Sequence, residues 1–450
     1  MKHNLKQYPV CWDGATKLLN IPSANIAAEL KMTDFPPLAD PWQAMVNAME
    51  NPLGCPPISQ SLKPGSKVAL MTGDRFTDQI LGSQEQMGLR LLDYLNSLGV
   101  RDEDVTFIYA PGSHPTPKWR EIMGQPFLNR VRSLRHDCFD EDSLTYLGVT
   151  SRCTPVWVNK AVMEADFRLA IGEISPNVHG GWCGGGKIIL PGVAGWDTIA
   201  HNHFGVVKDI NTLGLADGNH IRRDMEEGAR MAHLDMKVDL LIDHQARIVD
   251  VYAGDFVAEH RAALDNRARS IWMTKMEPAD IYVLYPGEGS DRYLSSSFFI
   301  RMEGAELGTK EDGIIILALS AAGGWAPPQT DPKDRWIGPT EGYELFKAGT
   351  AEIAKQMVRK AVDVRGASIL YTSRRVLERR KVFLVSDGIQ PDEARALGFA
   401  YGASCFDEAL AAALEEKGPN ARIAVNILNQ PITNPPGRPV TWRVMPWREG

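Results

Sequence analysis

The residues with the most chemical potential lie in a glycine-rich segment at 173–203, EISPNVHGGWCGGGKIILPGVAGWDTIAHNH. Glycines after a strand let the backbone approach a phosphate closely, and their N–H groups can form an anion-binding nest. The spacing up to Lys187 fits a P-loop, but Ile188 stands where Ser or Thr must bind magnesium, and Pro191 prevents the helix that a P-loop opens. A dinucleotide fingerprint also fails, because Ile189 replaces its third glycine.

Lys187 therefore has two interpretations. In the first, the lysine and the tight glycine turn bind a phosphate, which is the commoner role of such a loop. In the second, the lysine amine forms a covalent link to a carbonyl-type group, as lysines do in cofactor enzymes. The residues of the loop leave both interpretations open.

Two histidines, His201 and His203, follow in a segment that we expect to be helical at 196–204. Residues two apart on a helix diverge by about 200°, so at most one of them faces a common site. The alternative for each is an ordinary helical histidine. An imidazole with no Cys or carboxylate cluster nearby suits nickel, copper or zinc only where a non-protein ligand fills the other positions.

Asp74 and His114 each follow a predicted strand, at 67–72 and 105–110. Ligands of open α/β sheets bind beyond the carboxyl ends of the strands, so both residues lie where a site is expected. A histidine there can act as a general base near neutral pH. The alternative is a turn-stabilising role, since both residues lie in turn-like segments.

A regular alternation of strands and helices must position these residues, and it indicates parallel α/β structure. The first sixty residues are loop-rich and show no strong period. The patterns that follow predict strands at 67–72, 105–110, 131–136, 155–160, 167–173, 237–243 and 247–255, and helices at 81–99, 141–147, 196–203, 219–232 and 256–269.

A second series of strands and helices begins near residue 280. It predicts strands at 281–285, 313–319, 368–372 and 381–386, and helices at 291–303, 341–363, 391–397 and 406–416. We therefore expect two α/β domains, at 1–275 and 280–428. The proline-containing tail at about 430–450 is expected to pack back on the first domain.

The composition excludes several classes of protein. The 450 residues include 49 Lys and Arg against 56 Asp and Glu, so the net charge of −7 disfavours nucleic-acid and membrane-surface binding. The six cysteines form no C-x-x-C pair and are expected to be reduced thiols. The N-terminus lacks the pattern of a secretory signal, and no apolar stretch is long enough to span a membrane. We expect a cytoplasmic protein.

Taken together, the motifs resemble those of the nickel-pincer-nucleotide lactate racemase family. The resemblance runs in order from about residue 65 to 265, and more weakly through the second series. Its motifs are GSH (112–114), SPNVHGGWCGGGKIILPG (175–192), HNH (201–203), DGNHIRRDMEEGA (217–229) and AGDFVAEH (253–260). It implies two α/β domains with an active-site cleft between them, the first domain binding cofactor and nickel.

The resemblance also implies a cofactor and its attachment. The cofactor is the nickel-pincer nucleotide, pyridinium-3-thioamide-5-thiocarboxylic acid mononucleotide, which is joined to a lysine that aligns with Lys187. The fourth nickel ligand is a histidine that aligns with His203. Asp74 aligns with a residue that contacts the cofactor, and the glycines that would accommodate it are Gly184, Gly185 and Gly186. Cofactor-synthesis proteins are implied as transient partners.

The sequence departs from the family at the acid/base positions. The first of two catalytic histidines aligns with His114, but the second falls on Asn177, which cannot act as an acid or base. His179, two residues on, is the candidate replacement. Cys183 is a weaker one.

The substrate-binding cations of the family are also missing here. Its arginine falls on Thr77, although Arg75 is near, and its lysine falls among Ser296 to Phe299. The loss of two carboxylate-pairing cations indicates a substrate other than lactate. Phe298 or Phe299 and Trp325 are candidate pocket walls, and core packing is the alternative for them.

The resemblance thus predicts an isomerase that racemises or epimerises a 2-hydroxy acid. In that reaction a histidine takes the hydroxyl proton while hydride moves reversibly to the cofactor. One alternative keeps the cofactor but transfers hydride in one direction only. Another is a non-catalytic protein that binds a phosphorylated small molecule.

Overall fold

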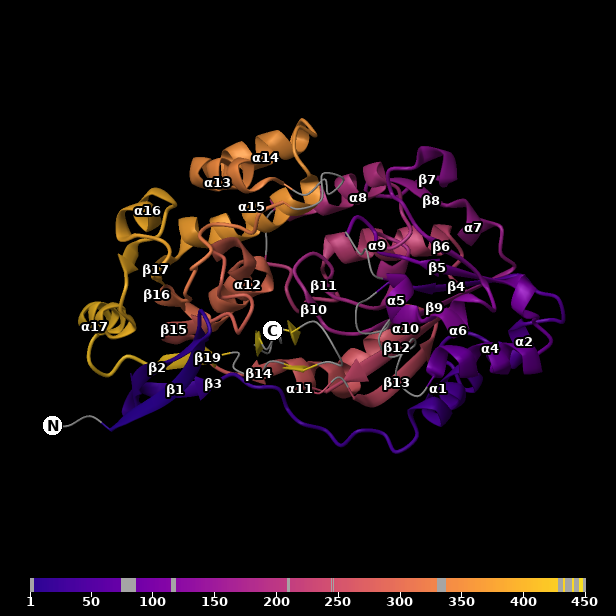
Figure 1. The fold of residues 1–450 in the computed structure, drawn as a ribbon, viewed down its shortest axis with the longest axis horizontal. Coiled ribbons are helices and arrows are strands. Elements are labelled where there is room, and N and C mark those ends of the chain that lie inside the picture. The colour runs from indigo at the N-terminus through magenta and orange to yellow at the C-terminus, as the bar shows by residue number, and fades with distance from the viewer. Residues whose placement is uncertain are drawn as a thin grey trace. The chain divides into compact units, whose positions relative to one another are not determined.

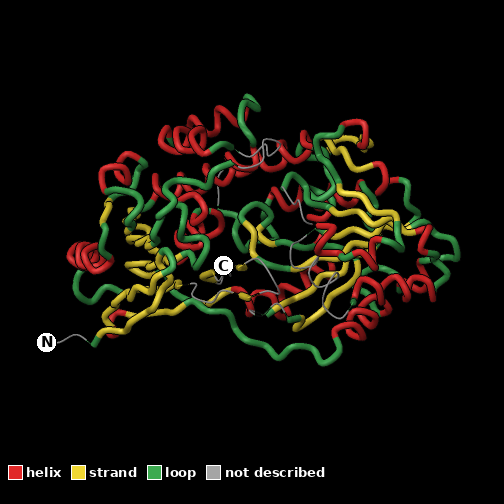
Figure 2. The backbone as a smooth tube through the Cα atoms, in the orientation of Figure 1, coloured by secondary structure: helices red, strands yellow, loops and turns green. Residues whose placement is uncertain are grey.

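A computed structural model describes residues 4–73, 86–114, 119–208, 211–243, 245, 247–329, 337–427, 432–433, 439–440 and 445–447. The chain forms two compact units. One comprises Asp34–Gly205 and Leu215–Arg269; the other comprises Met1–Thr33, Val206–Gly214 and Ser270–Gly450. We call them the lysine-loop unit and the C-terminal unit. Figure 1 and Figure 2 show that each combines helices with a twisted sheet.

The lysine-loop unit contains a six-stranded sheet in the order β13-β12-β9-β4-β5-β6. The strands are parallel except β13, which pairs antiparallel with β12. Their bounds are β4 Val68–Thr72, β5 Val105–Tyr109, β6 Arg132–Arg135, β9 Phe167–Glu173, β12 Met236–Ile242 and β13 Ile248–Gly254. β4 lies between β5 and β9, so the segments after these two strands leave the sheet at the same edge, as the sequence predicts.

Helices and two small hairpins surround this sheet. The hairpins are β7 Leu144–Val149 with β8 Pro155–Asn159, and β10 Pro176–Asn177 with β11 Gly181–Trp182. The helices are α1 Pro41–Glu50, α2 Ile58–Ser61, α4 Met87–Ser97, α5 Trp119–Met123, α6 Gln125–Leu128, α7 Lys160–Met163, α8 Trp196–His203, α9 His220–Met231 and α10 Ala258–Ala263.

The C-terminal unit has a second six-stranded sheet, in which every pair is parallel, in the order β18-β17-β16-β15-β19-β3. Its strands are β3 Ile26–Glu29, β15 Ala279–Tyr285, β16 Thr309–Ala318, β17 Lys381–Val385, β18 Tyr401–Ala403 and β19 Ile423–Ile427. The helices are α12 Phe299–Gly308, α13 Pro339–Ala348, α14 Thr350–Val358, α15 Val364–Arg379, α16 Pro391–Ala396 and α17 Phe406–Lys417, while α11 Arg269–Trp272 spans the boundary.

The first 33 residues depart from the expected domain division and from the expected loop. The hairpin of β1 Leu5–Trp12 and β2 Ala15–Pro22 packs with α17 in the core of the C-terminal unit, and β3 hydrogen-bonds to β19. Pairing between strands that are distant in the sequence therefore places the N-terminal residues in the C-terminal unit and not in the domain expected at 1–275. In the tail, β22 Met445–Trp447 pairs with β14 Met273–Lys275, also within the C-terminal unit.

Two local predictions are wrong. Of the helix expected at 141–147, only a 3-10 turn at Glu141–Ser143 forms, and the rest belongs to the strand β7, whose Tyr146 faces Trp157 of β8 with ring centroids 4.7 Å apart. The strand expected at 368–372 is the middle of α15, a buried helix of 16 residues. The short buried run at 368–372 suits either state, so its pattern alone cannot decide between them. Within the described residues, no helix is long and apolar enough to cross a membrane.

Candidate active site

The glycine-rich segment follows β9 at the carboxyl edge of the sheet in the lysine-loop unit. It forms the β10–β11 hairpin and then a 3-10 turn at Gly185–Ile188, on which Lys187 is half-buried. Beyond the turn, Ile189 and Val193 are fully buried in the core of the unit. The lysine is therefore carried on a loop whose far end is anchored by apolar packing.

The two histidines of α8 point in different directions, as helix geometry requires. His203 is buried, with 5% of its surface exposed, and its ring centroid lies 4.4 Å from that of His179. His201 is exposed, and its Nδ1 lies 2.9 Å from Thr154 Oγ1. His203 is thus the residue of the pair that reaches the glycine-rich segment.

The pKa of the buried His179 is affected by several of the predicted site residues. Its pKa is held well below the ordinary value, first by complete burial and then by positive charge on His203, Lys187 and His114. His114 itself is exposed, in the segment after β5. That segment bonds to the glycine-rich segment, because the N–H of Gly112 donates to the carbonyl of Gly192 at 2.9 Å.

Asn177 has a structural contact that the sequence did not predict. Its Oδ1 accepts the backbone N–H groups of His179 and Gly180, each at 3.0 Å. The side chain therefore fixes the turn that carries His179.

The three glycines before Lys187 are required by packing within the protein. Gly184 and Gly185 have φ values of +81° and +58°. A Cβ at Gly184 would lie 2.5 Å from Asp239 Oδ2, and one at Gly185 would lie 2.8 Å from the carbonyl oxygen of Phe256. At Gly186 a Cβ would lie 2.9 Å from that of Ala229. Their contact with a cofactor stays a prediction.

The other predicted residues are not described at the glycine-rich segment. Asp74, Arg75 and Thr77 fall outside the described residues, as does the side chain of Phe299. Trp325 is half-buried in the C-terminal unit, with ring centroids 5.1 Å from Phe346. It belongs to an aromatic cluster with Phe298, Tyr343 and Phe346. Packing thus explains Trp325 and Phe298, and their role toward a substrate stays a prediction.

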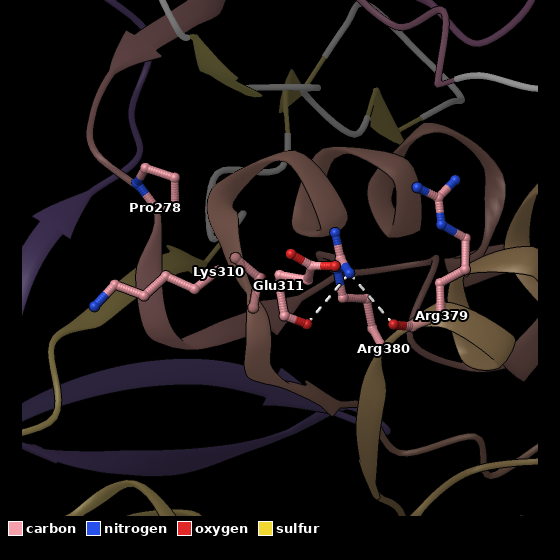
Figure 3. Close-up of a pocket in the computed structure, with 6 residues that line it drawn as sticks. Pro278, Lys310, Glu311, Arg379 and Arg380 are labelled. Atoms are coloured by element: carbon pink, nitrogen blue, oxygen red, sulfur yellow. Dashed lines mark hydrogen bonds between the residues drawn. The ribbon is translucent and has the colours of Figure 1, made fainter.

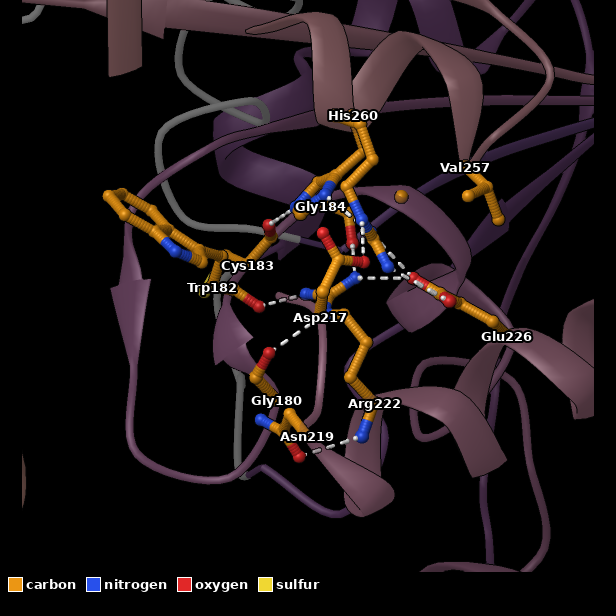
Figure 4. Close-up of polar contacts among 12 residues, drawn as sticks. Gly180, Trp182, Cys183, Gly184, Asp217, Asn219, Arg222, Glu226, Val257 and His260 are labelled. Carbon is orange, nitrogen blue, oxygen red and sulfur yellow. Dashed lines mark hydrogen bonds and ion pairs between the residues drawn. The ribbon is translucent and has the colours of Figure 1, made fainter. Parts of the chain in front are cut away.

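A layer of buried charged side chains, which local sequence patterns do not reveal, packs near the loop. The layer consists of Arg222, Lys237, Asp239, Glu259 and His260, all at most 1% exposed. Figure 4 shows Arg222 and His260 among the backbone carbonyls of the loop. Arg222 and His260 lie in two of the motifs quoted above, DGNHIRRDMEEGA and AGDFVAEH. The sequence therefore contains a signal for these two residues, but it does not indicate that they bind the loop.

The C-terminal unit has a cavity of about 610 Å³ that none of the predicted site residues line. Its walls, shown in Figure 3, are Pro278, Thr309, Lys310, Glu311, Arg379 and Arg380. The cations there have acidic partners: Lys310 pairs with Asp280 at 2.7 Å, and Arg379 with Glu306 at 3.3 Å. Across the described residues of both units, no group of three or more His, Cys, Asp or Glu side chains is arranged to hold a metal ion.

Comparisons with known proteins match both sequence and fold. Residues 12–214 match the family described as lactate racemase N-terminal domain. The lactate racemase of Thermoanaerobacterium thermosaccharolyticum is 27% identical over 64% of this chain and 69% of its own length. That of Lactiplantibacillus plantarum is 25% identical over 72% and 75%.

Two solved structures share the fold. The apoprotein of the Thermoanaerobacterium thermosaccharolyticum lactate racemase superposes with a TM-score of 0.76 at 22% identity, covering 98% of this chain and all of that one. A Thermotoga maritima protein superposes with a TM-score of 0.59 at 17% identity, covering 87% and 97%. The family match thus covers residues 12–214, the two related sequences show that the chain is similar to lactate racemases, and the two solved structures show a shared fold.

Proposed function

We propose that this protein is a racemase or epimerase of a 2-hydroxy acid other than lactate, using a nickel-pincer nucleotide attached to Lys187. The observation that carries the proposal is that several predicted site residues act on one buried side chain, that of His179. The ring centroid of His179 lies 4.4 Å from that of His203, and its pKa is lowered first by burial and then by positive charge on His203, Lys187 and His114. These are the residues to which family resemblance gives the cofactor link, the nickel ligand and the first acid/base group.

The residues present fit the proposed cofactor. The Nζ of Lys187 lies 3.9 Å from the Sγ of Cys183 and is half-buried, so its amine is held in a defined place within reach of a ligand. His203 offers one buried imidazole, a ligand type that suits nickel, and a pincer cofactor brings the other donors itself. The residues that would hold the group are therefore Lys187 and His203.

When bound, the cofactor supplies a carbon that accepts hydride from the α-carbon and returns it. The protein's residues supply the proton transfer and the orientation. His114 accepts the proton of the substrate hydroxyl on one side of the site, and His179 is assigned the same role for the opposite enantiomer. Asn177 cannot fill that second role, because it has no titratable group and its oxygen is bonded within the loop.

The substrate differs from lactate in this proposal because the carboxylate anchors differ. Thr77 stands in place of the arginine of the family, and residues 296–299 supply no lysine. A carboxylate without two such cations loses strong charge-assisted hydrogen bonds. A larger acid, with additional contacts to hold it, is the substrate class that we infer.

One-sided hydride transfer is the second candidate. It is favoured by Asn177, which stands where the family has its second catalytic histidine. If His179 does not act as a base, only His114 remains, and exchange would occur with one enantiomer. A protein that only binds a phosphorylated ligand through Lys187 is the third candidate.

The test begins with co-expression of the chain and the cofactor-synthesis proteins, followed by intact mass and nickel analysis. We expect a covalent adduct on Lys187 with bound nickel, absent from Lys187→Ala, and loss of nickel in His203→Gln but not in the matched His201→Gln. An unmodified chain without nickel would refute the cofactor assignment and favour the binding protein.

The loaded protein is then incubated with enantiopure 2-hydroxy acids that carry deuterium at the α-carbon. Inversion with retained deuterium supports a racemase. Loss of inversion in His179→Gln with continued hydride exchange supports two histidine bases. Hydride exchange in the parent protein without any inversion would instead support one-sided transfer.

A further inference from the structure

Three carbonyl oxygens of the lysine loop, which we define as residues 176–187, converge on one buried guanidinium. Arg222 of α9 is fully buried, and its Nε donates to the carbonyl of Gly180 at 2.7 Å. Its Nη1 donates to the carbonyl of Gly184 at 3.4 Å, and its Nη2 donates to that of Trp182. All three nitrogens of the side chain thus bind the same loop, as Figure 4 shows.

Neutral carbonyl groups are unusual partners for the buried guanidinium of Arg222, because a charge is costly to bury. Removing a guanidinium from water is costly, and hydrogen bonds to neutral carbonyls only partly offset that cost. The carboxylate nearest to Arg222 is Glu226, whose Oε1 lies 3.7 Å from Nη1 and bonds to Arg261 at 2.8 Å. Apolar packing would stabilise the core at this position with less cost, so the contact with the loop is the distinctive property of Arg222.

Three further peptide groups of the loop are also held by side chains. The N–H of Gly185 donates to Asp239 Oδ2 at 2.7 Å, and Asp239 is ion-paired with Lys237. His260 Nε2 donates to the carbonyl of Cys183 at 2.9 Å, and Asn219 Nδ2 donates to that of His179 at 3.0 Å. Strand pairing within the loop amounts to the two residue pairs of β10 and β11. The N–H of Cys183 also donates to the carbonyl of Ser175 at 2.6 Å, and side chains bind six of the loop's peptide groups in addition to these backbone bonds.

We propose that Arg222 is a positioning residue that holds the lysine loop in the shape that presents His179 and Lys187 to one site. Its contacts span the loop, because Gly180 directly follows His179 and Gly184 comes three residues before Lys187. A lysine at position 222 keeps the charge but cannot direct donors at three carbonyls with the planar fork of a guanidinium. What the site binds rests on the proposed function, whereas the clamp on the loop does not.

The experiment compares Arg222→Lys with Arg223→Lys, the same substitution at the exposed next residue of α9. The first readout uses the protein without cofactor. It is the rate at which a small acylating reagent modifies Lys187, relative to the other lysines, measured by peptide mass spectrometry. We expect a several-fold faster reaction in Arg222→Lys, because release of the loop exposes a half-buried amine, and no change in Arg223→Lys.

The second readout is the rate of covalent loading after co-expression. We expect it to fall at least about tenfold in Arg222→Lys, since small displacements of a reacting group are costly. If the parent protein forms no adduct, the proposed function fails, while the acylation rates still test the clamp. Unchanged acylation of Lys187 in a folded Arg222→Lys protein overturns the proposal.

A third variant separates positioning from a loss of stability. In Arg222→Ala, added methylguanidinium can occupy the vacated space and should restore the parental acylation rate of Lys187, whereas methylammonium should not. A merely structural role for Arg222 predicts equal effects of the two cations, and that outcome also overturns the proposal. If Arg222→Ala does not fold, the Lys variant and its exposed control decide the question.

Discussion

The buried histidine that follows β6 predicts a specific loss of stability in acid. His136 is fully buried, and its Nε2 donates to the carbonyl of Ala194 at 2.9 Å. Its Nδ1 lies 3.1 Å from Asn159 Nδ2 and so accepts from that amide. Asn159 cannot turn its oxygen toward the ring without a loss, because Oδ1 already accepts the N–H of Ala161 and caps α7. Protonation of Nδ1 therefore removes the hydrogen bond that it accepts from Asn159.

Burial lowers the pKa of His136 from 6.5 to about 4, with desolvation as the largest cause. Below pH 6.5 the unfolded chain takes up a proton that the folded chain does not, so the free energy of unfolding falls as the pH falls toward 4. The full difference corresponds to about 3 kcal/mol, and the part lost between pH 7.5 and pH 5 to about 2 kcal/mol. His136→Gln removes this contribution while keeping an amide donor for the Ala194 carbonyl.

The assay is urea unfolding, followed by tryptophan fluorescence at pH 7.5 and pH 5. Other buried histidines add to the pH dependence of the parent protein, so the informative quantity is the difference between parent and variant. We expect the loss between the two pH values to be about 2 kcal/mol smaller in His136→Gln. The exposed His233, changed to Asn because its φ is +53°, is the control that should leave the loss unchanged. Equal losses in the parent and in His136→Gln would refute the assignment of the acid sensitivity to this site.

Two further predictions concern other buried positions. Gly181→Ala should lower the free energy of unfolding of the lysine-loop unit by about 3 kcal/mol or more in urea titrations, because its Cβ would overlap the carbonyl of Leu215 at a φ of +72°. Gly218→Ala, at a similar φ of +76° with no atom near its Cβ, should cost only the backbone strain of about 1–2 kcal/mol, and equal losses would contradict the packing argument. Burial raises the pKa of Glu303 to about 8 although Arg375 lies 3.2 Å away, so the folded chain retains a proton that the unfolded chain releases above pH 4.5. Stability contributed by this group should therefore decline from pH 5 to pH 8 in thermal unfolding, and Glu303→Gln should weaken the decline, whereas a parallel profile would disprove it.

The sequence predicted the parallel α/β elements well where the local pattern was strong. The strand expected at 167–173 and the helix expected at 196–203 have those bounds in the structure. The pattern failed where contacts between distant segments decide the outcome. The N-terminal hairpin is stabilised by packing on a sheet formed mainly from residues after 279, and β7 by its pairing with β8. Such contacts leave no mark on local periodicity.

The candidate site was only partly visible for a related reason. A histidine, a lysine and a run of glycines are conspicuous by type and spacing, so Lys187, His179 and His203 are candidates from the sequence alone. The side chains that hold the loop were missed because RRDMEE, residues 222–227, resembles a solvated helix face. In the structure Arg222, Asp224 and Glu226 are all buried. Charged residues are buried only where partners exist, and their partners lie on other elements.

The sequence by itself determined the parallel α/β class, the position of the lysine in a glycine turn, and the rule that His201 and His203 cannot face the same site. These follow from local chemistry and from the geometry of single elements. Only the tertiary structure decided that His203 is the inward residue, that His179 packs beside it, and that Arg222 binds three carbonyls of the loop. Burial and hydrogen bonding between distant segments depend on the whole packed chain, and they set which of the residues found in the sequence can act together.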